Sequence, residues 1–527
     1  MKRTPGSRAG LRPGLLPGLL AALAASTAIV PVACGEAAAP CDPDAFPVVP
    51  DDPTRPRVHF TPPAGWMNDP NGLVVADGRW HLFYQHNPDD VSWGPMHWGH
   101  AVGDDPVTFA HRPVALAPDP ERGWIYSGSA VVATGAAARA LCGAEAAADP
   151  ACLVAAYTHQ DWAAGTQSQS LAASTDRGET WVPYAGNPVL ADPTRPDFRD
   201  PKVFRHAPAD AWVMVVAAGD RALFYRSPDL VEWTPSGAFG PVAGMEAAWE
   251  CPDLFLLDVA GREGDARWVF KVDSGRARYF VGTFDGAAFA SPDAPRFVDG
   301  APDFYAAQSW SDAPDGRRTW IAWMNAWEYA GATPADGWRG AMTLARDLAL
   351  AVDGARVDLV QRPVAELDAW LGPAWDMPRD IELPAGGNVA LGRGDALDLR
   401  ARLRPGPGGE MALVVLADDE AGTRVGFDAA AGTLFLDRTD AGTFGHGAFA
   451  RRFDVPVVAD EDGAVSVRVI VDRGSVEVFA MDGRAVLTGL AFPAPGADAV
   501  RITTGVAGGR VDGLVVRPLR PPGCGGR

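Results

Sequence analysis

Three acidic residues stand in surroundings that could hold a carboxylate in place for chemistry. They are Asp69 in WMNDPNG, Asp200 in FRDPKVF and Glu250 in WECPDLF. Proline follows the first two directly and follows Glu250 after one cysteine. Because proline fixes its own φ and restricts the residue before it, the backbone at these acids has little freedom. Two carboxyl groups among aromatic side chains are the minimum needed to hydrolyse a glycosidic bond.

Each acid on its own also has an ordinary structural explanation. Asn-Asp-Pro-Asn-Gly suits a surface turn, with Asn71 and Gly72 able to adopt a positive φ. Arg199 could form a local ion pair with Asp200, and Glu250 could be a buried, hydrogen-bonded acid. The many tryptophans favour the chemical interpretation, because a flat ring with a polar edge is suited to stack on a sugar face. The tryptophans considered are Trp66, Trp93, Trp98, Trp124, Trp249 and Trp327.

The acids lie in residues 55–360, whose sequence predicts short β-strands between turns. The alternating runs are HLFYQHNP, WVMVVAAG, ALFYRSP, RWVFKVDS and RTWIAWMN. A weak repeat of a small residue, an aspartate-bearing turn and an aromatic residue occurs at 103–109, 174–181, 227–233 and 282–289. Its period is typical of four-stranded blades around an axis, so a β-propeller is favoured over an irregular β domain with unrelated hairpins. The inner strands of a propeller meet at one channel, which would bring the three acids together.

A second region of different pattern follows the first. Residues 361–379 are predicted to be a connector, in which QRPVAELDAW forms a short helix. Residues 380–520 are predicted to form a β-sandwich, because their strands alternate regularly. Between Val465 and Gly489 apolar residues occupy every second position around two turns, which is a strong hairpin pattern. This region has few clustered acids, so we expect the chemistry in the first.

The N-terminal residues 1–34 have the pattern of an export signal, with a basic start and then an apolar stretch. A transmembrane anchor is the alternative. The stretch ends in PVAC, which loosely resembles a lipoprotein cleavage site with Cys34 as the acylated residue. A freely secreted protein and one held on the cell envelope by this lipid are therefore both left open. Residues 35–54 are rich in Ala, Pro and Asp and are predicted to be a linker.

The remaining cysteines, the metal-binding motifs and the net charge indicate which disulfides, cofactors and partners to expect. Cys142 and Cys152 bracket a short loop and could pair, as could Cys41 and Cys524 near the ends of the mature chain, which leaves Cys251. The sequence has no CxxC pair and no HExxH motif, so we expect neither a structural zinc nor a zinc hydrolase. No other metal and no organic cofactor is implied by the sequence. The net charge of −20 argues against nucleic acid or an anionic membrane surface as a partner. The oligomeric state is left open.

The motifs around the acids, taken in order, resemble glycoside hydrolase family 32, which includes invertases, levanases and inulinases. The matching motifs are WMNDPNG (66–72), YQHNP (84–88), WGPMHWGHA (93–101), YSGSA (126–130), FRDPKVF (198–204), WECPDLF (249–255), DFYAAQSW (303–310), WRGAMTLARDL (338–348) and GSVEVFAMDG (474–483). They span nearly all of residues 57–515. The resemblance implies an all-β fold, a five-bladed β-propeller followed by a C-terminal β-sandwich. It also implies hydrolysis of terminal β-fructofuranosyl bonds with retention of configuration.

The resemblance further implies a role for each acid. Asp69 corresponds to the nucleophile, Glu250 to the general acid/base, and Asp200 to a third acid that binds fructose hydroxyls and stabilises the transition state. A retaining mechanism places its two carboxyl groups roughly 5 to 5.5 Å apart. The positions that match substrate-binding residues of the family are Asn68, Gln85, Trp93, Tyr126, Ser127, Arg199 and Trp327.

The residues beside the acids agree with these roles. Amide donors from Asn68 and Asn71 are expected to keep Asp69 ionised. Glu250, between a tryptophan and a cysteine and near two other acids, is suited to act in its protonated form. Cys251 is more plausible as a neighbour that tunes these acids than as a nucleophile, since no histidine motif accompanies it.

Three further motifs indicate which substrate to expect within the family. MHWGHA, DFYAAQSW and NAWEYA are most similar to the exo-acting levanase and exo-inulinase branch, so we expect release of fructose from chain ends of levan or inulin, with sucrose also cleaved. A sucrose-specific invertase and an endo-levanase are the alternatives within the family. WMNDPNG and WECPDLF disfavour an arabinan hydrolase. A non-catalytic fructan-binding protein is the alternative from another class, and the three intact acids argue against it.

Overall fold

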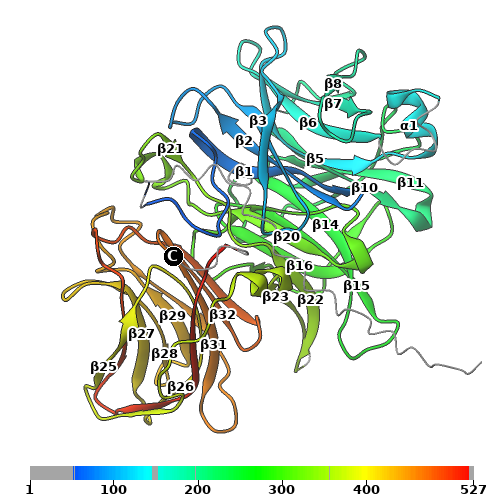
Figure 1. The fold of residues 1–527 in the computed structure, drawn as a ribbon. Helices are drawn as coiled ribbons and strands as arrows, with labels where there is room; N and C mark the ends of the chain where they lie inside the picture. Colours follow the sequence, from blue (N-terminus) through cyan, green and yellow to red (C-terminus); the bar gives the residue numbers. More distant parts are fainter. Residues whose placement is uncertain (1–51, 53, 145–151, 196, 355, 522–527) are drawn as a thin grey trace, which may run out of the picture. The chain divides into compact units, whose positions relative to one another are not determined.

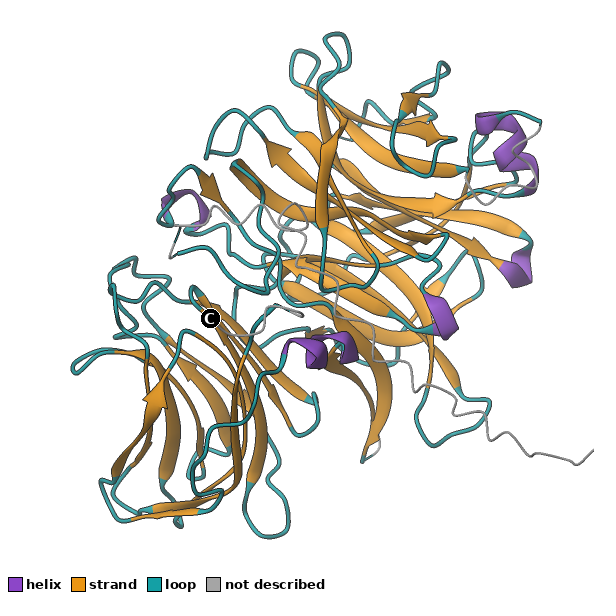
Figure 2. Cartoon of the chain, viewed as in Figure 1, coloured by secondary structure: helices purple, strands orange, loops and turns teal. Residues whose placement is uncertain are grey.

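The computed structural model describes residues 52, 54–144, 152–195, 197–354 and 356–521. Strands make up most of the described residues, and the helices among them are short (Figure 2). The predictions for the export signal, for the linker apart from residues 52 and 54, and for Cys34, Cys41 and Cys524 lie outside the described residues. No helix within the described ranges is both long and apolar enough to cross a membrane.

Five sheets follow one another within residues 65–363 (Figure 1). The first contains β1 (Gly65–Ala76), β2 (Arg79–Asn87), β3 (His97–Gly103), β4 (Ala110–Leu116) and β21 (Trp338–Arg339). The second contains β5 (Trp124–Val132), β6 (Leu153–Asp161), β7 (Thr166–Ser174), β8 (Val182–Pro183) and β9 (Leu190–Ala191), with α1 (Gly135–Cys142) after β5. The third contains β10 (Phe198–His206), β11 (Ala211–Ala218), β12 (Ala222–Ser227) and β13 (Thr234–Phe239).

The last two of these sheets complete the set. The fourth contains β14 (Glu250–Asp258), β15 (Ala266–Asp273), β16 (Ala277–Phe284), β17 (Phe289–Ala290) and β18 (Arg296–Phe297). The fifth contains β19 (Tyr305–Ser309), β20 (Thr319–Trp323), β22 (Arg346–Asp353) and β23 (Arg356–Pro363). The first strand of each sheet contacts the first strand of the next, and β19 contacts β1, so the five sheets close into a ring. This is the five-bladed β-propeller that the motifs predicted.

The weak sequence repeat marks the same connection in four of the blades. It lies between β3 and β4, between β7 and β8, between β12 and β13, and between β16 and β17. The aspartate accepts hydrogen bonds from main-chain N–H groups of the turn, as Asp105 Oδ1 does from Val107 at 2.8 Å and from Thr108 at 2.7 Å. Asp229 does the same in the third blade. The repeat exists because each of these turns needs an acceptor for its free N–H groups.

Each innermost strand departs from regular pairing near one end. The shifts lie between residues 67 and 70 in β1, 126 and 128 in β5, 199 and 202 in β10, 250 and 253 in β14, and 305 and 308 in β19. Three of them contain a non-glycine residue with positive φ, namely Asp200 at 63°, Cys251 at 48° and Ala306 at 55°. A bulge turns a side chain away from the regular alternation, so these shifts set the direction of the residues near the axis.

Two six-stranded sheets form the predicted sandwich. One has the order β24 (Ile381–Leu383), β35 (Gly509–Pro518), β26 (Ala396–Pro405), β31 (Val465–Asp472), β32 (Ser475–Ala480) and β33 (Ala485–Leu490). The other has the order β25 (Asn388–Arg393), β34 (Ala499–Thr504), β27 (Glu410–Ala417), β28 (Thr423–Asp428), β29 (Thr433–Asp437) and β30 (Arg452–Pro456). The hairpins predicted between Val465 and Gly489 are β31 with β32 and β32 with β33. Their inward Val and Leu side chains pack in the core between the sheets.

The connector begins later than predicted. Strand β23 continues to Pro363, past the expected boundary at residue 360, because Gln361 still pairs with Leu348 of β22. The predicted helix is a 3₁₀ segment, Ala365–Trp370, with Leu367 and Trp370 buried.

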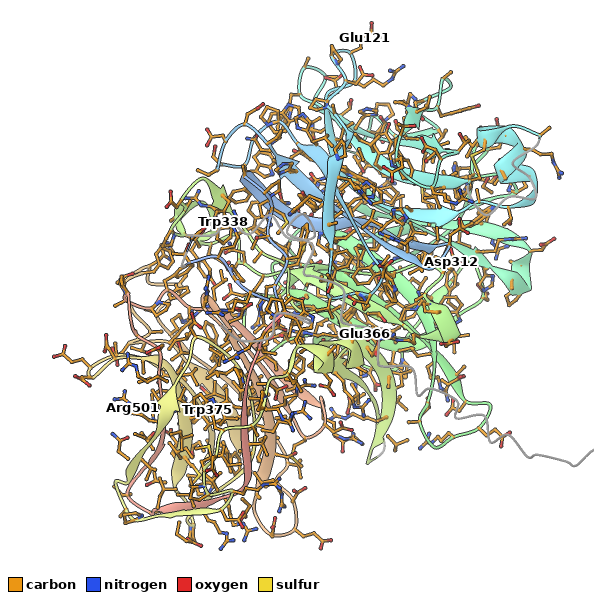
Figure 3. The ribbon with its side chains drawn as sticks, viewed as in Figure 1. Glu121, Asp312, Trp338, Glu366, Trp375 and Arg501 are labelled. Atoms are coloured by element: carbon orange, nitrogen blue, oxygen red, sulfur yellow. A yellow bond between two sulfur atoms is a disulfide. The ribbon has the colours of Figure 1, made fainter. Side chains whose placement is uncertain are left out.

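Trp338 of β21, labelled in Figure 3, donates its indole N–H to Asp52 Oδ2 at 2.7 Å.

A buried network of ionisable groups joins the two regions. His59 bonds through Nδ1 to Asp472 Oδ2 and through Nε2 to Glu477 Oε1, both at 2.8 Å. Arg346 donates to Glu477 Oε2 at 2.6 Å and to Asp299 Oδ2 at 3.2 Å. All five side chains are 0% or 1% exposed. Burial alone would lower the pKa of His59, but its two carboxylate partners raise it to about 9.

Candidate active site

The innermost strands bring the three predicted acids together. Asp69 lies in β1, Asp200 in β10 and Glu250 at the start of β14. Cys251 links them: its main-chain N–H donates to Asp200 Oδ2 at 2.9 Å, and its Sγ lies 3.4 Å from Asp69 Oδ2. Since Cys251 directly follows Glu250, all three acids meet around this one residue. The alternative of a surface turn at residues 68–72 is wrong, because these residues form part of a buried strand.

Asp69 is held by donors on both carboxylate oxygens. Asn68 Nδ2 donates to Oδ1 at 2.9 Å, and the Ser127 hydroxyl donates to Oδ2 at 2.7 Å. Trp66 Nε1 donates in turn to Asn68 Oδ1 at 2.7 Å, which fixes the orientation of that amide. Asn71 was expected to donate to the same carboxylate, and this is wrong: its amide donates to the main-chain oxygen of Asp69 at 2.6 Å. The carboxylate therefore has one rigid orientation, with a thiol as its third neighbour.

Glu250 has partners on both carboxyl oxygens and also reaches solvent. Arg199 Nη2 donates to Oε1 at 3.0 Å, and the Tyr305 hydroxyl donates to Oε2. The Glu250 side chain is 29% exposed, whereas Asp69 and Asp200 are buried. A group that gives a proton to a leaving group and later takes one from water needs access to both. Of the three acids, Glu250 has the placement for that exchange.

Burial and mutual repulsion shape the acidity of the site. Burial raises the pKa of Asp69 above its usual value, and the charge of Glu250 adds to this, while Asn68 and Ser127 oppose it through their hydrogen bonds. The pKa of Asp69 is therefore raised, whereas the amide donors expected from the sequence would by themselves have lowered it. Burial, with the charges of Asp69 and Glu250, raises the pKa of Asp200 to about 6 although Arg199 opposes the shift. Burial and the nearby acids raise the pKa of the Cys251 thiol well above its usual value, which suits a neutral neighbour rather than a nucleophile.

A buried ion pair of Lys271 and Asp273 on β15 lies next to Glu250 at the start of β14. Lys271 Nζ donates to the Cys251 carbonyl oxygen at 3.1 Å and also contacts Asp273. Asp273 is the register partner of Glu250 across β14 and β15, so both side chains lie on the same face of the sheet. Burial raises the pKa of Asp273 to about 7 despite the lysine. Lys271 donates to the Cys251 carbonyl while Asp200 accepts from the Cys251 N–H, so both main-chain polar groups of this residue with positive φ are held.

The other predicted pocket positions differ in their burial and in their contacts. Gln85 Nε2 donates to Asn71 Oδ1 at 3.0 Å and to the Ile125 carbonyl at 3.1 Å, so it supports the strand that carries Asp69. Tyr126 is half-buried and packs in the same cluster as Cys251. Trp93 is 39% exposed and Trp327 is 44% exposed.

The structure separates the six tryptophans into two groups. Trp66, Trp98 and Trp249 are 0% or 1% exposed and pack in hydrophobic cores, so the expectation that they offer a face to a sugar is wrong. Trp327 stacks on Trp66 with ring centroids 6.2 Å apart, and Trp93 contacts Trp124 at 5.3 Å. Tyr305, Lys271 and Asp273 were not assigned a role from sequence. The motif DFYAAQSW contains Tyr305 and was the one available signal for it.

The structure also shows how the cysteines of its described part are paired. Cys142 and Cys152 form the predicted disulfide, and Cys251 is a free, buried cysteine. In the part of the chain that the structure describes, no group of three or more His, Cys, Asp or Glu side chains is arranged to hold a metal ion.

A five-bladed propeller with three converging acids, followed by a β-sandwich, defines this protein as a glycosidase. Residues 59–363 match the model of the glycosyl hydrolases family 32 N-terminal domain, and residues 379–517 match that of the family 32 C terminal. The chain belongs to glycoside hydrolase family 32.

Its relatives include both bacterial and fungal enzymes. A levanase of Bacillus subtilis is 43% identical over 489 residues, which cover 89% of this chain and 71% of that protein. An extracellular exo-inulinase of Aspergillus awamori is 34% identical over 517 residues, covering 88% of this chain and 93% of that protein. The crystal structure of exo-inulinase from A. awamori superposes with a TM-score of 0.79 at 30% identity, covering 89% of this chain and 99% of that one. A fructofuranosidase of Schwanniomyces occidentalis complexed with fructosylnystose has a TM-score of 0.80 at 27% identity, over 89% and 98% of the two chains.

Proposed function

We propose that the protein releases terminal fructose from β-fructans such as levan and inulin, also cleaves sucrose, and retains the configuration at the anomeric carbon. The observation that carries this proposal is the convergence of Asp69, Asp200 and Glu250 around Cys251. The names of the relatives, levanase and exo-inulinase, support the class of substrate.

The proposed mechanism gives each acid one task. Asp69, oriented by Asn68 and Ser127, attacks the anomeric carbon of the terminal fructose. Glu250, which is reached by solvent, protonates the departing oxygen and then removes a proton from the water that hydrolyses the fructosyl-enzyme intermediate. Asp200 binds fructose hydroxyls, and its bonds should strengthen as the ring flattens toward an oxocarbenium ion, which lowers the barrier rather than tightening ground-state binding.

Electrostatic arrangement supports this division of tasks. Arg199 donates to Glu250 and lies 4.0 Å from Asp200, so one cation offsets the charge of two acids. The neutral thiol of Cys251 stands 3.4 Å from the Asp69 oxygen and 3.6 Å from the Asp200 oxygen. A weak donor between two carboxylates reduces their repulsion without adding a competing charge.

The test is product analysis with the purified protein. Levan, inulin, sucrose and arabinan are incubated separately, and the products are separated by chromatography. Free fructose as the sole early product from levan or inulin agrees with the proposal, whereas a ladder of oligosaccharides would identify an endo-levanase. Cleavage of sucrose alone would identify a sucrose-specific invertase, and release of arabinose an arabinan hydrolase. Binding of fructan without any product would identify a binding protein and refute the proposal.

We further propose that the protein acts outside the cytoplasm. The basic and apolar pattern of residues 1–34 supports export, and the exo-inulinases among the relatives are named extracellular. Mass spectrometry of the mature N-terminus decides between a free end and an acylated Cys34.

A further inference from the structure

A cluster of three tryptophans, Trp93, Trp124 and Trp162, lies beside the predicted pocket residues, and one of its members was not singled out from sequence. Trp124 begins β5, and Trp162 follows the last residue of β6. Their ring centroids are 5.3 Å apart with an interplanar angle of 70°. Trp93 completes the cluster at 5.3 Å from Trp124 and 6.3 Å from Trp162. Every contact is edge to face, so the three rings hold one another in fixed orientations.

The cluster is more exposed than tryptophan side chains usually are. Trp162 is 54% exposed and Trp93 is 39% exposed, whereas most other tryptophans in this propeller are buried. Leaving two large rings in water is unfavourable unless something covers them, since each carries a large apolar surface. Contiguous exposed aromatic groups are typical of a surface that meets a ligand.

The backbone around Trp124 and Trp162 holds the cluster in place. The Asp161 carboxylate accepts from the N–H groups of Ala163 and Ala164 at 2.8 and 2.9 Å, which fixes the turn that carries Trp162. Gly123 has a φ of 95°, and a Cβ there would lie 1.9 Å from the Gln160 carbonyl oxygen. Only glycine allows the start of β5 to approach the end of β6 so closely, and this approach brings the two tryptophans together.

The cluster is continuous with the acids. Along β5, Trp124 is followed two residues later by Tyr126 and then by Ser127, whose hydroxyl donates to Asp69. Trp93 lies 6.2 Å from the Tyr126 ring. Three residues of strand span about 10 Å, so Trp124 stands roughly that far along β5 from Ser127, the residue that orients Asp69. When the terminal fructose of a fructan is bound at the three acids, the units that follow it must leave the pocket along the surface next to it.

We propose that Trp124 and Trp162, with Trp93, form a stacking platform for the fructosyl units that follow the one being cleaved. This inference rests on the proposed function and adds that the enzyme prefers fructan chains over sucrose because of this platform. The occupant is a neutral carbohydrate: the rings present apolar faces with indole N–H edges, which match the C–H faces and hydroxyl edges of a sugar. Binding made equally in the ground state and the transition state should appear mainly in KM.

The test compares substrates of different length on matched variants. The variants are Trp162→Ala, Trp162→Phe, the double variant Trp124→Ala/Trp162→Ala, and Leu256→Ala as a control. Leu256 is an apolar side chain that is 46% exposed and stands six residues along β14 from Glu250, or about 20 Å. Kinetic constants are measured for sucrose, a fructan trisaccharide and a fructan pentasaccharide. Melting temperatures of all variants establish that they are folded.

We expect Trp162→Ala to lower kcat/KM for the pentasaccharide by on the order of tenfold, chiefly through KM, and to leave sucrose within about twofold. The double variant should lose more, Trp162→Phe should retain most of the wild-type value, and Leu256→Ala should change nothing. Equal loss on sucrose and on the pentasaccharide, or no loss on either, would overturn the platform while leaving the proposed function standing. A wild-type enzyme that releases no fructose from any of the three substrates overturns the proposed function, and the platform with it.

Discussion

His59 should make the stability of this protein depend on pH in a direction that the structure determines. Both ring nitrogens of His59 bond to carboxylates, and both can donate only if the imidazole is protonated. Burial opposes a lowered pKa at both carboxylates, but the hydrogen bond from His59 lowers the pKa of Asp472, and the charge of Arg346 together with His59 lowers that of Glu477. Replacing His59 by glutamine removes the positive charge and keeps a hydrogen-bonding side chain of similar reach.

The magnitude follows from the shift of one pKa. The pKa of His59 rises from 6.5 to about 9 in the folded protein. A difference of about 2.5 units at 1.36 kcal/mol per unit corresponds to about 3 kcal/mol of folding free energy. Because the folded-state pKa is the higher one, this contribution is fully present below pH 6.5 and is lost as the pH rises through 9. Other groups titrate as well, but those that do not contact His59 do so in the wild type and in the variant alike.

The assay is urea unfolding of wild type and His59→Gln at pH 6 and at pH 10. We expect the difference in unfolding free energy between the two proteins to be about 3 kcal/mol larger at pH 6 than at pH 10. A difference that is the same at both values would show that His59 is not charged in the folded protein. In that case the account of this buried network as an ion cluster would be wrong.

The remaining predictions concern the acids and the disulfide. Asp69→Ala and Glu250→Ala should each lower kcat by roughly a thousandfold or more, and Asp69→Ala should have the larger effect. An aryl fructoside, which has a good leaving group, should restore part of the rate only to Glu250→Ala. Equal recovery in both variants would contradict the assigned roles. Asp200→Asn should lower kcat far more than it raises KM, as steady-state kinetics on sucrose will show. Replacing Cys142 and Cys152 by alanine should lower the urea-unfolding free energy by about 2 to 3 kcal/mol without changing kcat, since their separation in sequence is only 10. Incubation with EDTA should leave the rate unchanged.

Much of the fold was predictable because its signals are local. The aspartate turns recur because each blade needs acceptors for the same free N–H groups, and the hairpins from Val465 onward follow from alternation over a few residues. The acids were predictable from proline neighbours and family motifs. That the acids converge could be predicted by assuming that the inner strands of a propeller lie around one axis.

What was missed depends on contacts between distant parts of the chain. The burial of Trp66 and Trp249 is decided by neighbouring blades, which sequence composition does not reveal. Asp273 faces Glu250 only through the register of β14 with β15. The direction of the Asn71 amide is set by the irregular pairing of β1 with β2, since a bulge changes which atoms a side chain can reach.

The closed ring of inner strands makes catalysis a property of the whole propeller. Asp69, Asp200 and Glu250 come from the first, third and fourth blades, and the first strand also touches that of the fifth. A fragment that lacked one blade would keep at least two of the three acids but lose the closed ring that relates their positions. Loss of turnover during unfolding should therefore report the opening of the ring at any of its five joints.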